Sequence, residues 1–233
     1  MLMNDNAVIL ASFLGGMLPA ILWLEFWLRE ARHHEPRRLI VGTFLLGMFS
    51  VIIAGVLERS VTYVFIEFTT ISFFLWALIE ELVKFAVAYA VGIRSRFCDD
   101  PIDPSLYLIT SALGFAAAEN MLFLHDALVD GGIGRGLASI VDRFVGASLL
   151  HVITACIVGI SIGFSFWKSA HAKRIAIYIG LFIAVLLHTA FNRFIIEGDG
   201  HRFWVFSSTW IGLVVVILIL EKIKNAKKIK RTS

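Results

Sequence analysis

Charged residues are scarce in this sequence. Asp, Glu, Lys and Arg make up 17% of its 233 residues, whereas hydrophobic residues make up 58%. Soluble domains carry about 25% charged and roughly 45–50% apolar residues. The composition therefore excludes a disordered chain, a nucleic-acid-binding domain and an ordinary cytosolic enzyme. It predicts an all-α, polytopic membrane protein.

Cysteine and proline are also rare. The two cysteines, Cys98 and Cys156, are too few for a disulfide framework, and no Cys-x-x-Cys metal motif occurs. The His-Glu-x-x-His helix of many zinc proteases is absent as well. Any chemistry in this chain must therefore use a different set of side chains.

Seven stretches are apolar over about 20 residues, the length that an α-helix needs to cross a roughly 30 Å hydrocarbon layer. They comprise residues 7–28, 39–57, 64–93, 105–126, 138–167, 175–196 and 203–221. The connectors between them are short and polar, so residues 1–233 are predicted to form a single transmembrane domain. No basic segment precedes the first stretch and no small-residue cleavage site follows it, which indicates a retained helix.

The basic residues gather on one side of the predicted spans. The connectors after the first, third and fifth spans, together with the C-terminal segment 222–233, carry 15 Lys and Arg, against 3 on the opposite side. Because basic residues resist translocation, the N-terminus is expected outside and the basic tail in the cytoplasm. The tail is expected to rest on anionic lipid, with the bilayer as its partner and no nucleic acid.

A few polar residues lie deep inside the spans, where a charge costs about 2.5–3.5 kcal/mol even on a lenient insertion scale. They are Glu80, Glu81, Lys84, Glu119, Asn120, His151, His188 and Asn192. At about 1.5 Å per residue, four of them share a depth of roughly 20–24 Å from the cytoplasmic edge. These four are Glu80, Glu119, His151 and His188. The shared depth predicts one polar pocket in the outer half of the membrane.

A purely structural interpretation exists for single members of this set. Glu80 and Lys84 could form a neutralised pair four residues apart, and a buried histidine is often a satisfied core residue. One lysine cannot neutralise Glu80, Glu81 and Glu119, so at least one of these carboxylates must be protonated, bound to a metal or hydrogen-bonded. This favours a functional site. Arg143 belongs either to the outer rim of the pocket or to the headgroup layer.

Glutamate, histidine and asparagine around a hydrated cavity are suited to hydrolysis. A carboxylate can take a proton from water as a general base. His188 and Asn192 lie one helical turn apart and could both donate hydrogen bonds to the oxyanion that develops on a peptide carbonyl. The set therefore favours hydrolysis of a peptide bond within the membrane.

The motifs resemble, in order, those of the PrsW family of intramembrane endopeptidases, which is related to the CAAX prenyl proteases and to the scaffold subunit of γ-secretase. They are Glu80-Glu81-Leu-Val-Lys84, Gly114-Phe115-Ala-Ala-Ala-Glu119-Asn120, His151 and His188-x-x-x-Asn192. The resemblance covers a catalytic core of about residues 76–192. Asp103, shortly before the second motif, also fits the family pattern.

This resemblance implies a glutamic-type intramembrane endopeptidase in a bacterial or archaeal cell membrane, acting on membrane-anchored proteins such as anti-sigma factors. Glu80 and Glu81 correspond to the glutamates that activate water, and His188 and Asn192 to the pair directed at the oxyanion. Glu119 stands where a CAAX protease has histidine, so His151 is the expected partner of the water-activating group.

The expected catalytic residues are therefore Glu80, Glu81, Glu119, His151, His188 and Asn192, and the expected supporting residues are Lys84, Asn120 and Arg143. No cofactor is expected, because the lysine beside the site would repel a divalent cation. The alternative is a zinc-dependent protease whose metal is bound by His151, His188 and Glu81.

Two functions without proteolysis stay open. The carboxylates and histidines could relay protons in a transporter, or the pocket could serve a non-catalytic membrane scaffold. A transporter is disfavoured because it expects paired helix breaks near mid-span. The four prolines, at positions 19, 36, 101 and 104, provide no such pair.

Overall fold

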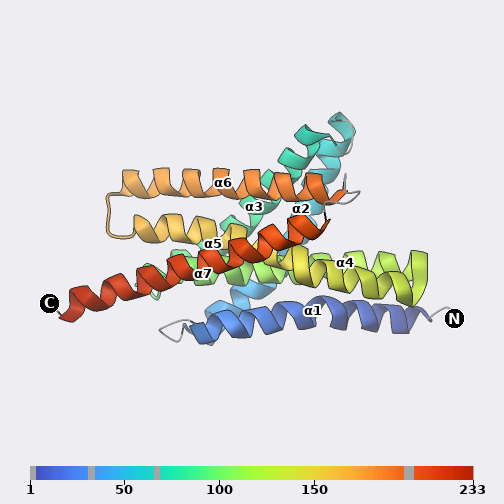
Figure 1. The fold of residues 1–233 in the computed structure, drawn as a ribbon, viewed down its shortest axis with the longest axis horizontal. Coiled ribbons are helices and arrows are strands. Elements are labelled where there is room, and N and C mark those ends of the chain that lie inside the picture. The colour runs from blue at the N-terminus through green and yellow to red at the C-terminus, as the bar shows by residue number, and fades with distance from the viewer. Residues whose placement is uncertain (1–3, 31–34, 66–68, 197–201, 233) are drawn as a thin grey trace.

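Long helices account for the regular structure of the chain in a computed structural model (Figure 1). The structure describes residues 4–30, 35–65, 69–196 and 202–232, and every regular element within these ranges is helical. The helices are α1 (Asp5–Glu30), α2 (Arg37–Val64), α3 (Thr70–Ala88), η1 (Tyr89–Ile93), α4 (Asp103–Asp142), η2 (Arg143–Ala147), α5 (Ser148–Phe164), α6 (Ala170–Ile196) and α7 (Arg202–Thr232). Both η elements are π-helical turns.

The first half of α4 and most of α5 form the centre of the bundle. Every residue from 103 to 117 and from 148 to 156 is buried. A helix that is apolar on all sides belongs inside a protein. The surrounding helices instead leave large apolar side chains exposed, among them Phe49 on α2, Phe182 on α6 and Trp204 on α7. An apolar outer surface of this extent is what the hydrocarbon of a bilayer covers.

Glycines bring α2 and α4 into close contact. A Cβ atom at Gly114 would meet the backbone of Phe44, and one at Gly47 would meet the backbone of Ser111. Small residues at such a crossing let two membrane helices approach until their backbones touch. The crossing fixes where α2 lies beside the polar residues of α4.

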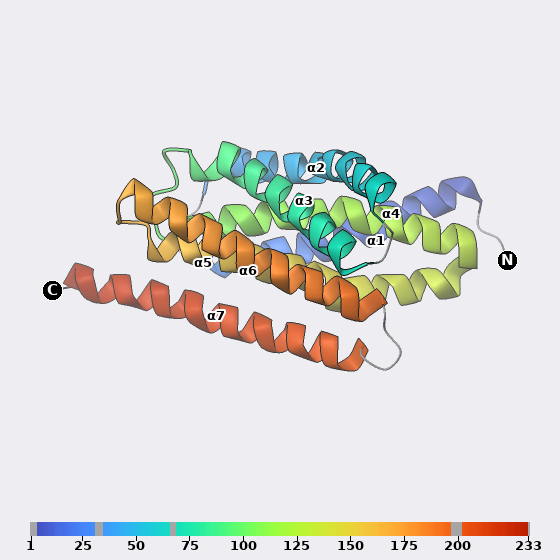
Figure 2. The same cartoon turned by 90° about the horizontal axis from the view of Figure 1, so that it is seen from above.

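The count of seven separate spans is wrong for the described residues, which form six continuous helical runs. The predicted spans 105–126 and 138–167 belong to one run from Asp103 to Phe164, of 62 residues. At about 1.5 Å per residue this run is roughly 93 Å long, far more than one crossing needs. It folds back at Gly132, whose φ of 66° is readily adopted only by glycine, and both views show the reversal (Figures 1 and 2). The connector expected at 127–137 is therefore helical on either side of one glycine.

The boundary between the second and third spans also differs from the prediction. α2 continues to Val64, so Glu58 and Arg59 lie within a helix and not in a connector. α3 starts at Thr70 because Thr69 and Ser72 form a capping box. The Thr69 hydroxyl accepts from the Ser72 amide at 3.2 Å, and the Ser72 hydroxyl accepts from the Thr69 amide at 2.8 Å.

The all-α, polytopic membrane fold is confirmed. Five helical runs are long and apolar enough to cross a membrane. The run of α3 and η1 is not one of these five, and it carries Glu80, Glu81 and Lys84. The expected tail at 222–233 continues α7 as far as Thr232, and Ser233 lies outside the described residues. α1 begins at one end of the bundle and α7 ends at the other (Figure 1).

Candidate active site

A large cavity opens between α2, α3, α4, α5 and α6. Its volume is about 1140 Å³. Six of the residues expected from the sequence line it, namely Glu80, Glu119, Arg143, His151, His188 and Asn192. These residues come from α3, α4, η2, α5 and α6, so the expected pocket is a single space.

Glu81 is the anchor of a buried network behind this cavity. Its Oε1 atom accepts a hydrogen bond from Lys84 Nζ at 2.7 Å and lies 2.8 Å from His188 Nδ1. All three side chains are 3% exposed. The network holds α6 against α3 and offsets the charge of Glu81 without help from solvent.

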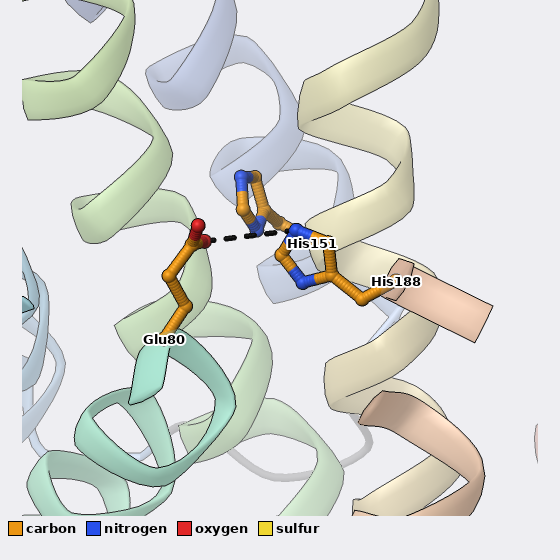
Figure 3. Close-up of side chains that lie close together, drawn as sticks. All are labelled: Glu80, His151 and His188. Carbon is orange, nitrogen blue, oxygen red and sulfur yellow. Dashed lines mark ion pairs between the residues drawn. The ribbon is translucent and has the colours of Figure 1, made fainter. Parts of the chain in front are cut away.

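Glu80, next to Glu81 on α3, points toward two histidine rings. Its Oε2 lies 3.7 Å from His188 Nε2 and 3.9 Å from Lys84 Nζ, and this buried oxygen has no hydrogen-bond partner among the described residues. The rings of His151 and His188 meet edge to face, with centroids 5.3 Å apart. Figure 3 shows Glu80 of α3, His151 of α5 and His188 of α6 pointing toward one another.

Lys84 also determines how the His151 ring is used. Its Nζ lies 2.9 Å from His151 Nδ1, and the other ring nitrogen, Nε2, lies 3.2 Å from Glu119 Oε2. An ammonium group can only donate, so Nδ1 accepts and Nε2 carries the proton that is donated to Glu119. His151 thus contacts Glu119 directly, a pairing that was not expected from the sequence.

Arg143 lines the pocket. It donates from Nη2 to Glu119 and from Nε to the Asn120 side chain, and its guanidinium lies 4.1 Å from the centroid of the Phe123 ring. The amide nitrogen of Asn120 donates in turn to the Ser148 hydroxyl at 3.1 Å. Arg143 begins η2, and π-helical turns inside α-helices often occur at functional sites.

These contacts settle the charge balance of the three glutamates. Lys84 and His188 compensate Glu81, and Arg143 compensates Glu119. Glu80 is left with Lys84 at 3.9 Å and with an oxygen that receives no hydrogen bond. A buried acceptor without a donor is costly unless a water, a metal or a substrate supplies one.

Asp103 does not join the site. It lies sixteen residues before Glu119 on α4, about 24 Å along the helix. Its carboxylate accepts from the backbone amides of Asp99 at 2.9 Å and Asp100 at 2.7 Å. It therefore stabilises the turn that leads into α4.

Sequence reasoning missed a third glutamate in the cavity wall. Glu58 lines the cavity from α2, together with Arg59 and Thr62. It was missed because Glu58-Arg59-Ser60 has the composition of a polar connector. The apolar residues that follow, Val61 to Val64, are the signal that the helix continues.

A Gly-x-Ser-x-Gly sequence at residues 159–163 is not a nucleophile elbow. It lies within α5, where the Ser161 hydroxyl donates to the Ile157 carbonyl of its own helix at 2.9 Å. The elbow requires a tight turn between a strand and a helix. Both cysteines are free thiols, and Cys156 is buried.

Comparison with known proteins decides which family carries this site. The model of the PrsW family of intramembrane metalloproteases matches residues 35–220, which is most of the chain. The chain belongs to the PrsW family. The match begins before α2 and ends within α7, so it extends well beyond the motifs at 76–192 and includes Glu58.

Curated proteins named protease PrsW are similar to this chain over nearly its whole length. A protease PrsW of Clostridioides difficile is 28% identical over 231 residues, which cover 94% of this chain and 90% of the relative. Those of Shouchella clausii and Bacillus subtilis are 24% and 25% identical and cover 92% of this chain, and 96% and 94% of the relative. No solved structure matches the chain significantly. The chain is accordingly a multi-pass intramembrane protease, which sets aside the transporter and the scaffold.

The site residues fit the metal that the family description implies. Glu80, His151 and His188 each offer one ligand atom, all within 4.8 Å of one another. Two imidazoles and a carboxylate form a common ligand set for catalytic zinc, and Glu80 Oε2 is an acceptor without a donor. Lys84 is less of an obstacle to a cation than the sequence implied, because Glu81 takes up its charge. The carboxylate that offers a ligand atom together with both histidines is Glu80, whereas the set expected from the sequence named Glu81.

Proposed function

We propose that the chain is a glutamic-type endopeptidase of the cell membrane, with Glu80, His151 and His188 at its reaction centre and membrane-anchored proteins as substrates. The observation that carries the proposal is the buried Oε2 of Glu80, which faces a cavity of about 1140 Å³ and has no donor of its own. A water held there by the carboxylate is in place to attack a peptide carbonyl, with Glu80 accepting its proton.

The neighbours of Glu80 orient the two histidines. Glu81 accepts from His188 Nδ1, so the other ring nitrogen is directed at Glu80, 3.7 Å away. Lys84 and Glu119 hold His151 in one tautomer from opposite sides of its ring. Fixed ring orientations of this kind are what a general base and its partner need before the substrate arrives.

Asn192 and Arg143 supply donors in the wall of the same cavity. Asn192 lies one turn after His188 on α6, and Arg143 carries a full positive charge. Donors placed where an oxyanion develops lower the barrier of acyl transfer. We assign Asn192 to the oxyanion and Arg143 to holding Glu119 in place.

A second form of the same reaction uses zinc. The grouping of Glu80, His151 and His188 favours it, and the family description names a metalloprotease. These three side chains would hold the ion, with His151 giving up its contact with Lys84 or Glu119 to free a ring nitrogen. The ion would polarise the peptide carbonyl and lower the pKa of a bound water. Glu81 would then orient His188 through Nδ1, as carboxylates behind metal-bound histidines do.

The substrate is proposed to enter from the outer side. The Lys and Arg distribution supports a cytoplasmic C-terminal tail, and the depth counted along the spans supports a reaction centre in the outer half of the membrane. Membrane-anchored regulators such as anti-sigma factors present a peptide segment at that level. The start of α1 and the end of α7 lie at opposite ends of the bundle, as this orientation requires (Figure 1).

The test is cleavage by purified protein in lipid vesicles. A single-span reporter is added with and without a zinc chelator, and the fragments and the metal content of the protein are measured. Fragment release supports the endopeptidase, and release by a chelated, metal-free sample identifies the glutamic form. Loss of release on chelation, restored by zinc, identifies the zinc form. Absence of any fragment, across reporters that vary the outer juxtamembrane sequence, would contradict the proposed function.

A further inference from the structure

Glu58 is a cavity residue that the reaction scheme above does not use. It lies in the last two turns of α2 and lines the same cavity as Glu80 and Glu119. Its Oε1 atom is buried and has no hydrogen-bond partner in the described part of the chain. The three carboxylates are near enough to interact electrostatically.

No described cation pairs with Glu58, which distinguishes it from its neighbours. Glu81 has Lys84, and Glu119 has Arg143. Arg59 follows Glu58 in the sequence, but side chains one residue apart on a helix point about 100° away from each other. A carboxylate held in a membrane cavity without a cation is unfavourable, and such residues usually mark a binding path.

The cavity as a whole carries more acid than base. Its lining holds six carboxylates, Glu58, Glu80, Glu119, Asp126, Asp130 and Asp142, against four guanidinium groups, Arg59, Arg135, Arg143 and Arg202. Two of these arginines are paired, Arg143 with Glu119 and Arg202 with Asp142. The cavity therefore attracts positive charge, and Glu58 is the carboxylate placed to receive it.

The position of Glu58 indicates which part of a substrate would meet it. It lies 21 residues after Arg37, the cytoplasmic end of α2, or about 32 Å along the helix. Counted in the same way from Ile93, Phe164 and Ala170, the three residues of the reaction centre lie at roughly 20–27 Å. Glu58 is thus nearer the outer surface than Glu80, at the level of the outer juxtamembrane segment of a single-span protein.

We propose that Glu58 is a specificity-determining residue that binds a Lys or Arg side chain in the outer juxtamembrane segment of the substrate. The incoming cation supplies the hydrogen bonds that the carboxylate lacks and fixes the register of the peptide at the reaction centre. This inference rests on the proposed function for its biological meaning. The binding step itself involves no bond breaking and is measurable without cleavage.

The experiment measures binding of labelled single-span peptides to the protein in neutral phosphatidylcholine vesicles. Three peptide series carry Lys, Gln or Glu at each of four successive outer juxtamembrane positions. We expect the wild type to prefer Lys over Gln at one position by about tenfold or more. Glu58→Gln is expected to abolish this preference, and Glu58→Lys to transfer it to the Glu peptide. Glu25→Gln is the matched control, because Glu25 lies on α1 in an exposed pair with Arg29.

Three outcomes would overturn the assignment. They are equal binding of Lys and Gln peptides by the wild type, a Lys preference that survives in Glu58→Gln, and a uniform loss of binding to all three series in that variant. Fragment release is recorded separately in the same vesicles. Binding selectivity without fragments would contradict the proposed function and leave the role of Glu58 supported, whereas fragments without selectivity would do the reverse.

Discussion

Lys84 Nζ lies 2.9 Å from Nδ1 of His151, and this contact joins α3 to α5 beside the reaction centre. The same ammonium group donates to Glu81 at 2.7 Å. One buried cation therefore offsets a carboxylate and sets the tautomer of a histidine. This makes Lys84 a positioning residue, which acts on the reaction through His151 and Glu81.

We expect Lys84→Met to destabilise the protein by about 3–5 kcal/mol, because it leaves Glu81 buried without its cation. Unfolding in detergent, followed by helical circular dichroism, measures the effect. Lys222→Met is the control, since Lys222 is exposed on α7 and surface substitutions cost about 0.5 kcal/mol or less. Equal stability of the two variants would show that the Lys84 cation does not stabilise the buried Glu81.

Substitutions of the two adjacent glutamates are expected to have very different effects on the stability of the protein. Glu81→Gln weakens contacts with Lys84 and His188 and should cost roughly 2–4 kcal/mol. Glu80→Gln removes a carboxylate whose Oε2 accepts no hydrogen bond, so it should leave the melting temperature unchanged or raise it. Unfolding of both variants under one condition gives the comparison. A larger loss for Glu80→Gln would reverse the assignment of the anchor and the reacting group.

Arg143→Lys is expected to lower the cleavage rate although the charge is kept. Arg143 donates from two different nitrogens, to Glu119 and to Asn120, and a single ammonium cannot reproduce that fork. We expect about a tenfold loss of rate, measured by fragment release, and a smaller loss of stability. Arg29→Lys, in an exposed pair on α1, provides the reference. An unchanged rate in Arg143→Lys would mean that charge alone suffices at this position.

Two glycines of α2 give opposite predictions. Gly47→Ala places a Cβ against the backbone of Ser111 and should destabilise by about 1–3 kcal/mol, because the α2–α4 crossing cannot tighten further. Gly55→Ala meets no atom within 4 Å and should stabilise by about 0.5–1 kcal/mol through helix propensity. Unfolding of both variants checks the sign. Stabilisation by Gly47→Ala would contradict the close approach.

Much of this architecture could be predicted from the sequence, because a membrane protein encodes it in long apolar runs. The shared depth of Glu80, His151 and His188 followed from counting residues at a fixed rise. Their convergence in space agrees with that count. At 100° per residue, Lys84 also projects between Glu80 and Glu81, and its contacts with them at 3.9 and 2.7 Å agree with that angle.

The boundaries of the polar segments could not be predicted in the same way. Glu58 and Arg59 occur in a stretch that composition alone assigns to a connector, but the crossing at Gly47 and the capping box at Thr69 place them inside α2. The connector around Gly132 is helical for a similar reason, since a single positive φ suffices to reverse the chain. Tertiary packing decides both cases.

The division of labour between the glutamates was also beyond the sequence. Spacing shows that Glu80 and Glu81 lie about 100° apart on α3, without showing which one faces the cavity. The partners on α6 and α5 decide it. Glu81 contacts His188 Nδ1 and Lys84, whereas Glu80 lines the cavity.

The central claim is that the carboxylate of Glu80 drives peptide hydrolysis in this cavity. The most direct measurement compares the wild type with Glu80→Gln in the same vesicles, using one single-span reporter and following fragment release over time. We expect Glu80→Gln to keep the wild-type melting temperature and to lose about 10²–10⁴-fold in rate. Cleavage by folded Glu80→Gln at the wild-type rate would contradict the account.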